Sequence, residues 1–290
     1  MQIIKLEIKD IIKKTFFRIC IVSLAMALLL LFYFQLKPQF IELAERLNEL
    51  PPELLKLIGA GTEINIIKIT YFFTYIMVIG NIILAYHALS SGSNALLKEE
   101  KRGSVYYLFA KPVGRSEVVL YKYMVHLLAY ALEVLLLFFI TAIFVIPSVS
   151  SKTVQIKWLK YNGEVLAGSF LLGAVFLSLG FWYSSFLPKE KEAEDYSFYT
   201  ILVFLIMGSI PNILRLANLL CTTIKGRGFA ILEEIGKKTE FLQNISPFEW
   251  LNPVRAMEGG YKTPVFITCI ILSAGLLGIS LICYNRRDFR

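Results

Sequence analysis

The sequence predicts an all-α protein that is embedded in a membrane. Of its 290 residues, 56% are hydrophobic and 18% are charged, whereas soluble domains average about 45–50% and about 25%. The apolar residues also gather in six runs long enough to cross the bilayer core, roughly 30 Å thick, as helices. The 22 Phe and 15 Tyr exclude disorder. We expect residues 1–290 to form a single transmembrane domain without a separate soluble domain.

Six helices are expected to cross the membrane. The fifth is the shortest and is expected to end at Pro211 and Asn212, and an even number of spans places both termini on one side. The expected spans are residues 17–36, 69–90, 121–146, 165–187, 197–214 and 264–284.

The basic residues predict that both termini are cytoplasmic. With the termini inside, the inner segments are more densely basic than the outer ones, as the positive-inside rule requires. We attribute the formal net charge of +8 to this bias and to anionic lipid. No aromatic-interleaved basic patch or nucleic-acid fingerprint is present, so no nucleic-acid partner is expected.

Residues 1–16 predict an amphipathic helix. Lys5, Lys9 and Lys13 recur every four residues among isoleucines and leucines, so they line one helical face. This pattern is typical of an interfacial helix with its lysines toward anionic headgroups. The alternative is a basic flank of the first span.

Three connections are long enough to contain structure. The outer loop 37–68 predicts two short amphipathic helices separated by Pro51 and Pro52. The outer loop 215–262 contains the amphipathic stretch GFAILEEIGKKTEFLQ and then SPFEWLNPVRAM. The inner loop 91–120 is the most polar of the three.

The usual catalytic and metal-binding motifs are missing, so no catalytic residue and no metal ligand is predicted. A phosphate-binding loop needs GxxxxGK[ST], and the nearest segment, Gly236-Lys237-Lys238-Thr239, lacks the upstream glycine. None of the four cysteines forms a CxxC pair, and neither histidine lies near a cysteine. The chain itself is therefore not expected to hydrolyse a nucleotide.

Glu133 lies near the middle of the third expected span. A carboxylate there costs about 2.5–3.5 kcal/mol on insertion scales, so it should face protein or a water-filled path. His126 lies on the same helical face, about 10 Å away along the axis, too far for both to bind one metal ion. Both are candidates for the translocation path. The alternative is a neutral Glu133, hydrogen-bonded against another span or a partner subunit.

The inner loop contains an aromatic cluster among charged residues. A short helix under the membrane would present Tyr106, Tyr107 and Phe109, and Pro112 would end it. Aromatic residues ringed by charges are typical of a protein docking surface. An aromatic belt at the headgroup layer is the alternative.

The segment from residue 99 to residue 122 also matches a longer pattern, E-x-x-(x)-G-[ST]-x-x-x-L-x-[SA]-x-P-V-[SG]-R followed by Lys. The matching residues are Glu99 or Glu100, Gly103, Ser104, Leu108, Ala110, Pro112, Val113, Gly114, Arg115 and Lys122. This pattern resembles the signature of the type-two ABC exporter permeases, the membrane subunits of ATP-binding-cassette exporters, and of their NatB-like or peptide-exporter-like members. At Leu108-Phe109 such members often have two leucines.

The resemblance implies that the chain pairs with a second permease, identical or different. Each permease would dock a cytoplasmic ABC ATPase subunit through a coupling helix in the inner loop. ATP and Mg would bind to that ATPase, and this chain would bind no cofactor. The candidate docking residues are Glu99, Glu100, Gly103, Ser104, Tyr106, Tyr107, Phe109, Pro112 and Arg115, with Lys9, Lys13 and Lys14 as secondary candidates.

The expected function is export across a bacterial plasma membrane, powered by the partner ATPase. Aromatic-rich spans with few polar residues suit a hydrophobic or amphipathic cargo such as a peptide, although the same residues suit a lipid-facing surface. The rival hypotheses are a proton-coupled secondary transporter that uses Glu133, a scaffold without transport, and an intramembrane enzyme that uses Glu133 and His126.

Overall fold

The computed structural model describes residues 2–51, 54–55, 69–98, 114–149, 151–225 and 230–287. Of residues 2–15, 44, 222–225, 230–233 and 258 it describes the backbone alone. Within the described ranges the regular structure is entirely helical. The helices are α1 (Gln2–Gln35), α2 (Lys37–Asn48), α4 (Ile69–Ser93), α7 (Arg115–Val145), the 3-10 turn η1 (Ile146–Ser148), α8 (Lys152–Phe186), α9 (Glu190–Lys225), α10 (Ala230–Lys238), α11 (Glu240–Gln243), α12 (Pro247–Trp250), α13 (Pro253–Gly259) and α14 (Thr263–Asn285).

Six helices among the described residues are long and apolar enough to cross a membrane. They are α4, α7, α8, α9, α14 and the part of α1 that begins at Phe16. Each overlaps one of the expected spans, which confirms the all-α membrane fold. Most of them begin earlier or end later than the expected spans.

The helix of the fifth expected span does not end at Pro211, because α9 continues through this proline to Lys225. A proline inside a helix removes one backbone hydrogen bond. Here α10 and α11 pack along the second half of α9, and Gln243 Nε2 donates to the carbonyl oxygen of Gly208 at 3.3 Å. We infer that this packing offsets the missing hydrogen bond.

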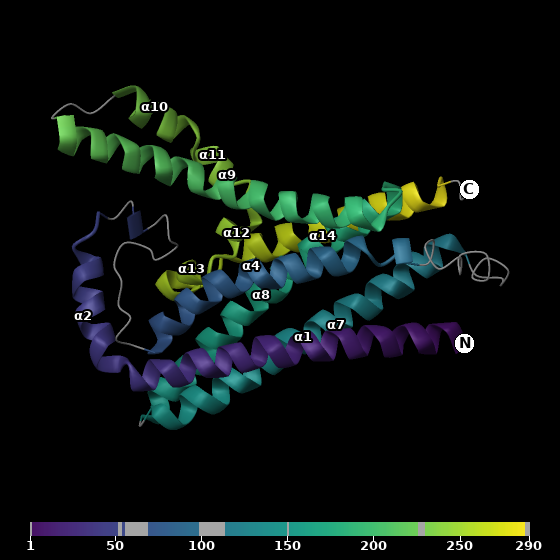
Figure 1. The fold of residues 1–290 in the computed structure, drawn as a ribbon, viewed down its shortest axis with the longest axis horizontal. Helices are drawn as coiled ribbons and strands as arrows, with labels where there is room; N and C mark the ends of the chain where they lie inside the picture. Colours follow the sequence, from purple (N-terminus) through teal and green to yellow (C-terminus); the bar gives the residue numbers. More distant parts are fainter. Residues whose placement is uncertain are drawn as a thin grey trace.

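The N-terminal residues are helical, as expected, but no break separates them from the first span. Helix α1 has 34 residues, which corresponds to about 51 Å at 1.5 Å per residue. It is therefore longer than the bilayer core is thick, about 30 Å, and Figure 1 shows it as one straight rod. An orientation of residues 2–15 along the headgroup plane would require a bend that α1 does not have.

Helix α8 lies at the centre of the bundle and packs against α4, α7, α9 and α14. In its most apolar window 72% of the residues are buried, against 17% for α14. Glycines allow the close approach. A Cβ added to Gly180 of α8 would lie 2.3 Å from the carbonyl oxygen of Leu89 in α4, and one added to Gly173 would meet the ring of Tyr130 in α7.

The short helices gather at one end of the bundle (Figure 1). Helices α2, α10 and α13 lie at the end opposite to the N- and C-termini, as does the second half of α9. The C-terminal end of α4 and the beginning of α7 lie at the end of the termini. The helices expected in the outer loops are thus present, although most of the second one expected in loop 37–68 lies outside the described residues.

Candidate functional site

Most of the predicted coupling helix lies outside the described residues. This holds for Glu99, Glu100, Gly103, Ser104, Tyr106, Tyr107, Phe109 and Pro112. The side chains of Lys9, Lys13 and Lys14 are likewise not described, although their backbone belongs to α1. What the structure gives is how the two ends of this segment, at Lys98 and Gly114, are held.

Arg115, at the beginning of α7, contacts the C-terminal tail. Its Nη1 donates to the backbone carbonyl oxygens of Asn285 at 3.1 Å and of Arg287 at 2.8 Å. Asn285 in turn donates from Nδ2 to Ser116 Oγ at 2.8 Å. A cation that donates hydrogen bonds to the carbonyl oxygens at the C-terminal end of a helix also interacts favourably with the helix dipole. Arg115, predicted as a docking residue, therefore has an intramolecular role in the structure.

Further hydrogen bonds fix the neighbouring helix ends. Arg287 donates to the carbonyl oxygens of Ser184 at 2.9 Å and Leu187 at 2.8 Å, which joins the tail to the end of α8. Lys122 Nζ donates to the carbonyl oxygen of Ala95 at 2.9 Å, which joins α7 to the turn after α4. The two ends of segment 99–113 are thus anchored to the ends of α4, α7, α8 and α14.

The predicted pair His126 and Glu133 lies on the face of α7 that meets α4, and both side chains are nearly inaccessible, at 6% and 3% exposure. They do not contact each other. His126 Nδ1 is 2.7 Å from Ser91 Oγ, and Glu133 Oε1 is 3.7 Å from His87 Nδ1. His87 and Ser91 are one helical turn apart on α4, so two matched pairs join the two helices.

These groups surround a very small cavity. It measures about 10 Å³ and is lined in part by Arg18 of α1, His87, His126, Tyr130 and Glu133. Within the described residues, His87 Nδ1 and Glu133 Oε1 are buried without a hydrogen-bond partner. A space of this size is close to the minimum for one water molecule. The arrangement can hold one water molecule, but the cavity is too small to pass a larger solute in this conformation.

The described residues contain no cluster of three His, Cys, Asp or Glu side chains that could hold a metal ion. His87 was missed by the sequence reasoning, although a histidine within an apolar span is itself a signal of a buried polar contact. The periodicity of one helix cannot tell which residue of another helix faces it.

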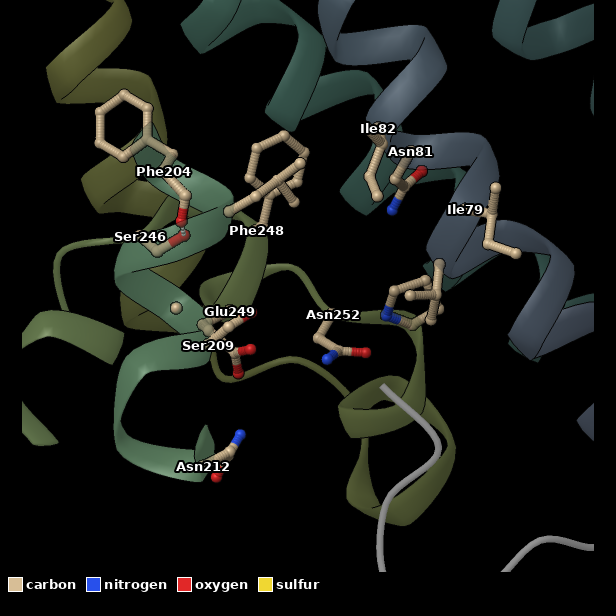
Figure 2. A pocket seen from close by; sticks show the side chains of 14 residues that line it. Ile79, Asn81, Ile82, Phe204, Ser209, Asn212, Ser246, Phe248, Glu249 and Asn252 are labelled. Atoms are coloured by element: carbon tan, nitrogen blue, oxygen red, sulfur yellow. Dashed lines mark hydrogen bonds between the residues drawn. The ribbon is translucent and has the colours of Figure 1, made fainter. Parts of the chain in front are cut away.

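A larger cavity, of about 180 Å³, lies between α4, α9, α12 and α13 (Figure 2). Figure 2 shows amide and carboxylate side chains that converge on it from these elements, with aromatic and aliphatic side chains around them. The sequence reasoning did not single it out, because isolated asparagines have no informative spacing. Its lining residues are Val78, Ile79, Asn81, Ile82, Phe204, Leu205, Gly208, Ser209, Asn212, Ser246, Phe248, Glu249, Asn252 and Pro253.

Hydrogen bonds to neighbouring residues fix the polar side chains that line this cavity. Ser169 Oγ donates to Asn81 Oδ1 at 2.6 Å, and Asn252 Oδ1 caps α13 by accepting from the backbone N–H of Val254 at 3.0 Å. Arg255 donates to Glu249 Oε2 at 3.3 Å. Burial raises the pKa of the Glu249 carboxyl, and the charge of Arg255 opposes this shift.

Comparison with known proteins finds a matching family and a similar protein. The model of a family described as ABC-2 family transporter protein matches residues 1–289. The chain is also 29% identical over 141 residues to the probable ABC transporter permease protein NosY of Pseudomonas aeruginosa. That alignment covers 47% of this chain and 48% of the relative, so it spans about half the length of each.

Proposed function

The chain belongs to the ABC-2 family of transporter proteins, and from this premise we propose that it is the membrane permease subunit of an ATP-driven exporter. The observation that carries the proposal is the family match over residues 1–289 together with six helices able to cross a membrane. The match to a protein named as an ABC transporter permease supports the same role.

A separate ATPase subunit is the proposed motor, since no nucleotide-binding motif occurs in the sequence. The segment 99–113 is the proposed docking site on the cytoplasmic side. In support, the helix ends on both sides of it lie at the same end of the bundle as the chain termini (Figure 1). The hydrogen bonds of Arg115, Lys122 and Arg287 would carry a movement of this segment into the spans.

We further propose that two permeases pair and that the cargo is hydrophobic or amphipathic, such as a peptide. Large apolar side chains are exposed along α1, α9 and α14, among them Phe17, Phe32, Val203 and Ile271. In a membrane such faces contact lipid or a second subunit.

The test is a mild-detergent affinity purification from the native membrane, assayed for vanadate-sensitive ATP hydrolysis. We expect an ATPase to co-elute in roughly equimolar amount with the wild-type chain and to be lost with Tyr106→Glu, because a buried charge disrupts an aromatic docking contact. Phe241→Glu is the matched control, since Phe241 is 58% exposed in α11. Normal ATPase association by Tyr106→Glu would contradict the docking proposal.

A proton-coupled secondary transporter is the second candidate, favoured by the buried Glu133 and His87 pair. Glu133→Gln preserves the shape of the side chain and removes its charge. Under the second candidate this variant abolishes transport, whereas depletion of ATP in a membrane with a maintained proton gradient does not. Under the exporter proposal ATP depletion stops transport.

A further inference from the structure

We propose that the cavity between α4, α9, α12 and α13 binds one apolar residue of a peptide, through its backbone amide and its side chain. This inference rests on the proposed function for the identity of the peptide as cargo. The site itself is argued from the geometry of the cavity, in which hydrogen-bonding groups and apolar walls face the same space.

The hydrogen bonds that anchor the asparagines leave their NH₂ groups for a ligand. The Oδ1 atoms of Asn81 and Asn252 are occupied by Ser169 and by the N–H of Val254. In Figure 2 the Nδ2 atoms of both residues point into the cavity. Asn81 as a whole is only 3% exposed, and no other described residue accepts a hydrogen bond from its NH₂ group. Two donors thus await an acceptor such as a peptide carbonyl oxygen.

Acceptors face the same cavity. Glu249 has its Oε2 bound to Arg255, and its carboxylate lies beside Ser209 in Figure 2. The amide of Asn212 makes no hydrogen bond to another described residue, and it is 8% exposed. Glu249, Ser209 and Asn212 can therefore accept a hydrogen bond from a peptide N–H.

The charge of the cavity favours an uncharged polar group. Glu249 provides the single ionisable side chain of the lining set, and Arg255 compensates its charge. The carboxylate of Glu249 would repel a free anion, and a free cation would compete with Arg255 for this carboxylate. A peptide bond has one donor and one acceptor and no net charge, which matches what the cavity presents.

The walls would receive the side chain. The rings of Phe204 and Phe248 both pack against the ring of Phe176, with centroid distances of 5.8 Å and 5.2 Å respectively. This packing fixes their positions. Ile79 and Ile82 of α4 line the opposite side (Figure 2). A volume of about 180 Å³ is below the range of about 300–1,000 Å³ for sites that enclose drug-sized ligands, which suits one residue of a longer chain.

The experiment measures binding of tritiated N-acetyl-Leu-Leu-Leu-amide to the purified full chain by scintillation proximity, in one detergent for all variants. Wild type should bind saturably. Asn252→Ser keeps a strong cap for α13 but loses the NH₂ group, and we expect its affinity to fall about threefold to tenfold. Ser209→Leu fills the cavity and should abolish saturable binding.

The matched control is Val203→Leu, which enlarges a side chain that is 51% exposed on the same helix. It should bind the peptide like wild type. Both proteins are measured in the same detergent, so the partitioning of the peptide into micelles is equal for the two and does not affect the comparison. An ester analogue of the probe, in which oxygen replaces the backbone N–H, should compete at least threefold more weakly than the amide.

Absence of saturable binding by wild type, or equal binding by wild type and a monodisperse Ser209→Leu protein, would overturn the proposal. Equal competition by the ester analogue would overturn the backbone recognition. The assay uses no ATPase, so its outcome is independent of the co-purification that tests the proposed function. A chain that binds the peptide without a co-purifying ATPase would refute the exporter and retain the site.

Discussion

At the scale of single residues, Arg115 joins the beginning of α7 to the C-terminal tail. Its guanidinium donates to two backbone carbonyl oxygens, of Asn285 and Arg287. We expect Arg115→Ala to lower the free energy of unfolding of the isolated chain by about 1–2 kcal/mol, since charged donors are worth more than neutral ones and this one is partly exposed. The measurement is thermal unfolding in detergent.

Arg115→Lys is the informative comparison. Lysine keeps the charge but offers a single donor group in place of a planar fork, so it should recover part of the lost stability. An unfolding temperature of Arg115→Ala equal to that of wild type would contradict the intramolecular role. If ATPase association then fell, Arg115 would act in docking, as the family resemblance implies.

Glu249 should make stability depend on pH. Because burial raises the pKa of this carboxyl in the folded chain, the folded state holds the proton more tightly than the unfolded state. Ionisation of Glu249 therefore costs stability, and this cost appears as the pH rises from about 4.3, the pKa of an unperturbed Glu, through the raised value. The stability of Glu249→Gln relative to wild type should thus be higher at neutral pH than at a pH of about 4.

The measurement compares unfolding temperatures of wild type and Glu249→Gln at both pH values. Arg255 is the charged group that contacts Glu249, and Gln can still accept its hydrogen bond. Lys238→Gln is a control, because its side chain is 73% exposed and pairs with Glu234. A relative gain for Glu249→Gln that grows toward acid pH would show that the Arg255 charge outweighs burial.

The sequence reasoning identified some of the important residues and missed their partners. It expected Glu133 to face protein or a water-filled path, and the structure shows a Glu133 that is 3% exposed. Its role in a translocation path stays a prediction. His87, Asn81 and Asn252 were not found, because each acquires its meaning from contacts between helices that are distant in the sequence.

At the scale of elements, the contact between α4 and α8 depends on two glycines. A Cβ added to Gly92 would lie 2.5 Å from the carbonyl oxygen of Leu177, and one added to Gly180 would lie 2.3 Å from that of Leu89. Both obstacles are backbone atoms, so the helices would have to separate. We expect Gly180→Ala to destabilise the chain by about 2 kcal/mol or more, as overpacking does.

Gly275→Ala in α14 is the matched control, since a Cβ there meets no atom within 4 Å. It should be neutral or stabilising by up to about 1 kcal/mol, the difference in helix propensity between the two residues. Both variants can be followed by thermal unfolding in the same detergent. Equal unfolding temperatures for Gly180→Ala and Gly275→Ala would mean that α4 and α8 are not in close backbone contact.

Element boundaries were harder to predict than element number. Hydropathy over a run of about 20 residues is a local property, so all six spans could be recognised. The continuation of α9 beyond Pro211 depends on α10 and α11, which pack against it from later in the chain. The uninterrupted α1 could not be foreseen, since the lysine spacing of residues 1–16 fits both a bent and a straight helix.

At the scale of the whole molecule, the two ends of the bundle differ in kind. One end contains the termini and the tight network around Arg115 and Arg287. The other contains the short helices α2 and α10–α13 and the cavity of Figure 2. In the proposed exporter, the first end would receive the motor and the second would lie on the exit side. The sequence predicted that the termini and the short loop helices lie at opposite ends, but it predicted neither the cavity nor the central position of α8.

The orientation of these ends in the membrane is tested by single cysteines labelled with an impermeant thiol reagent, after replacement of the native Cys20, Cys221, Cys269 and Cys283. Suitable sites must be exposed, and the side chain of Lys189, between α8 and α9, is 74% exposed. The positive-inside rule predicts labelling of Lys189→Cys only in permeabilised cells. Asn244→Cys, at the opposite end, should be labelled in intact cells. The reverse pattern would place segment 99–113 outside, where no cytoplasmic ATPase could reach it, and would therefore contradict the docking proposal as well as the orientation.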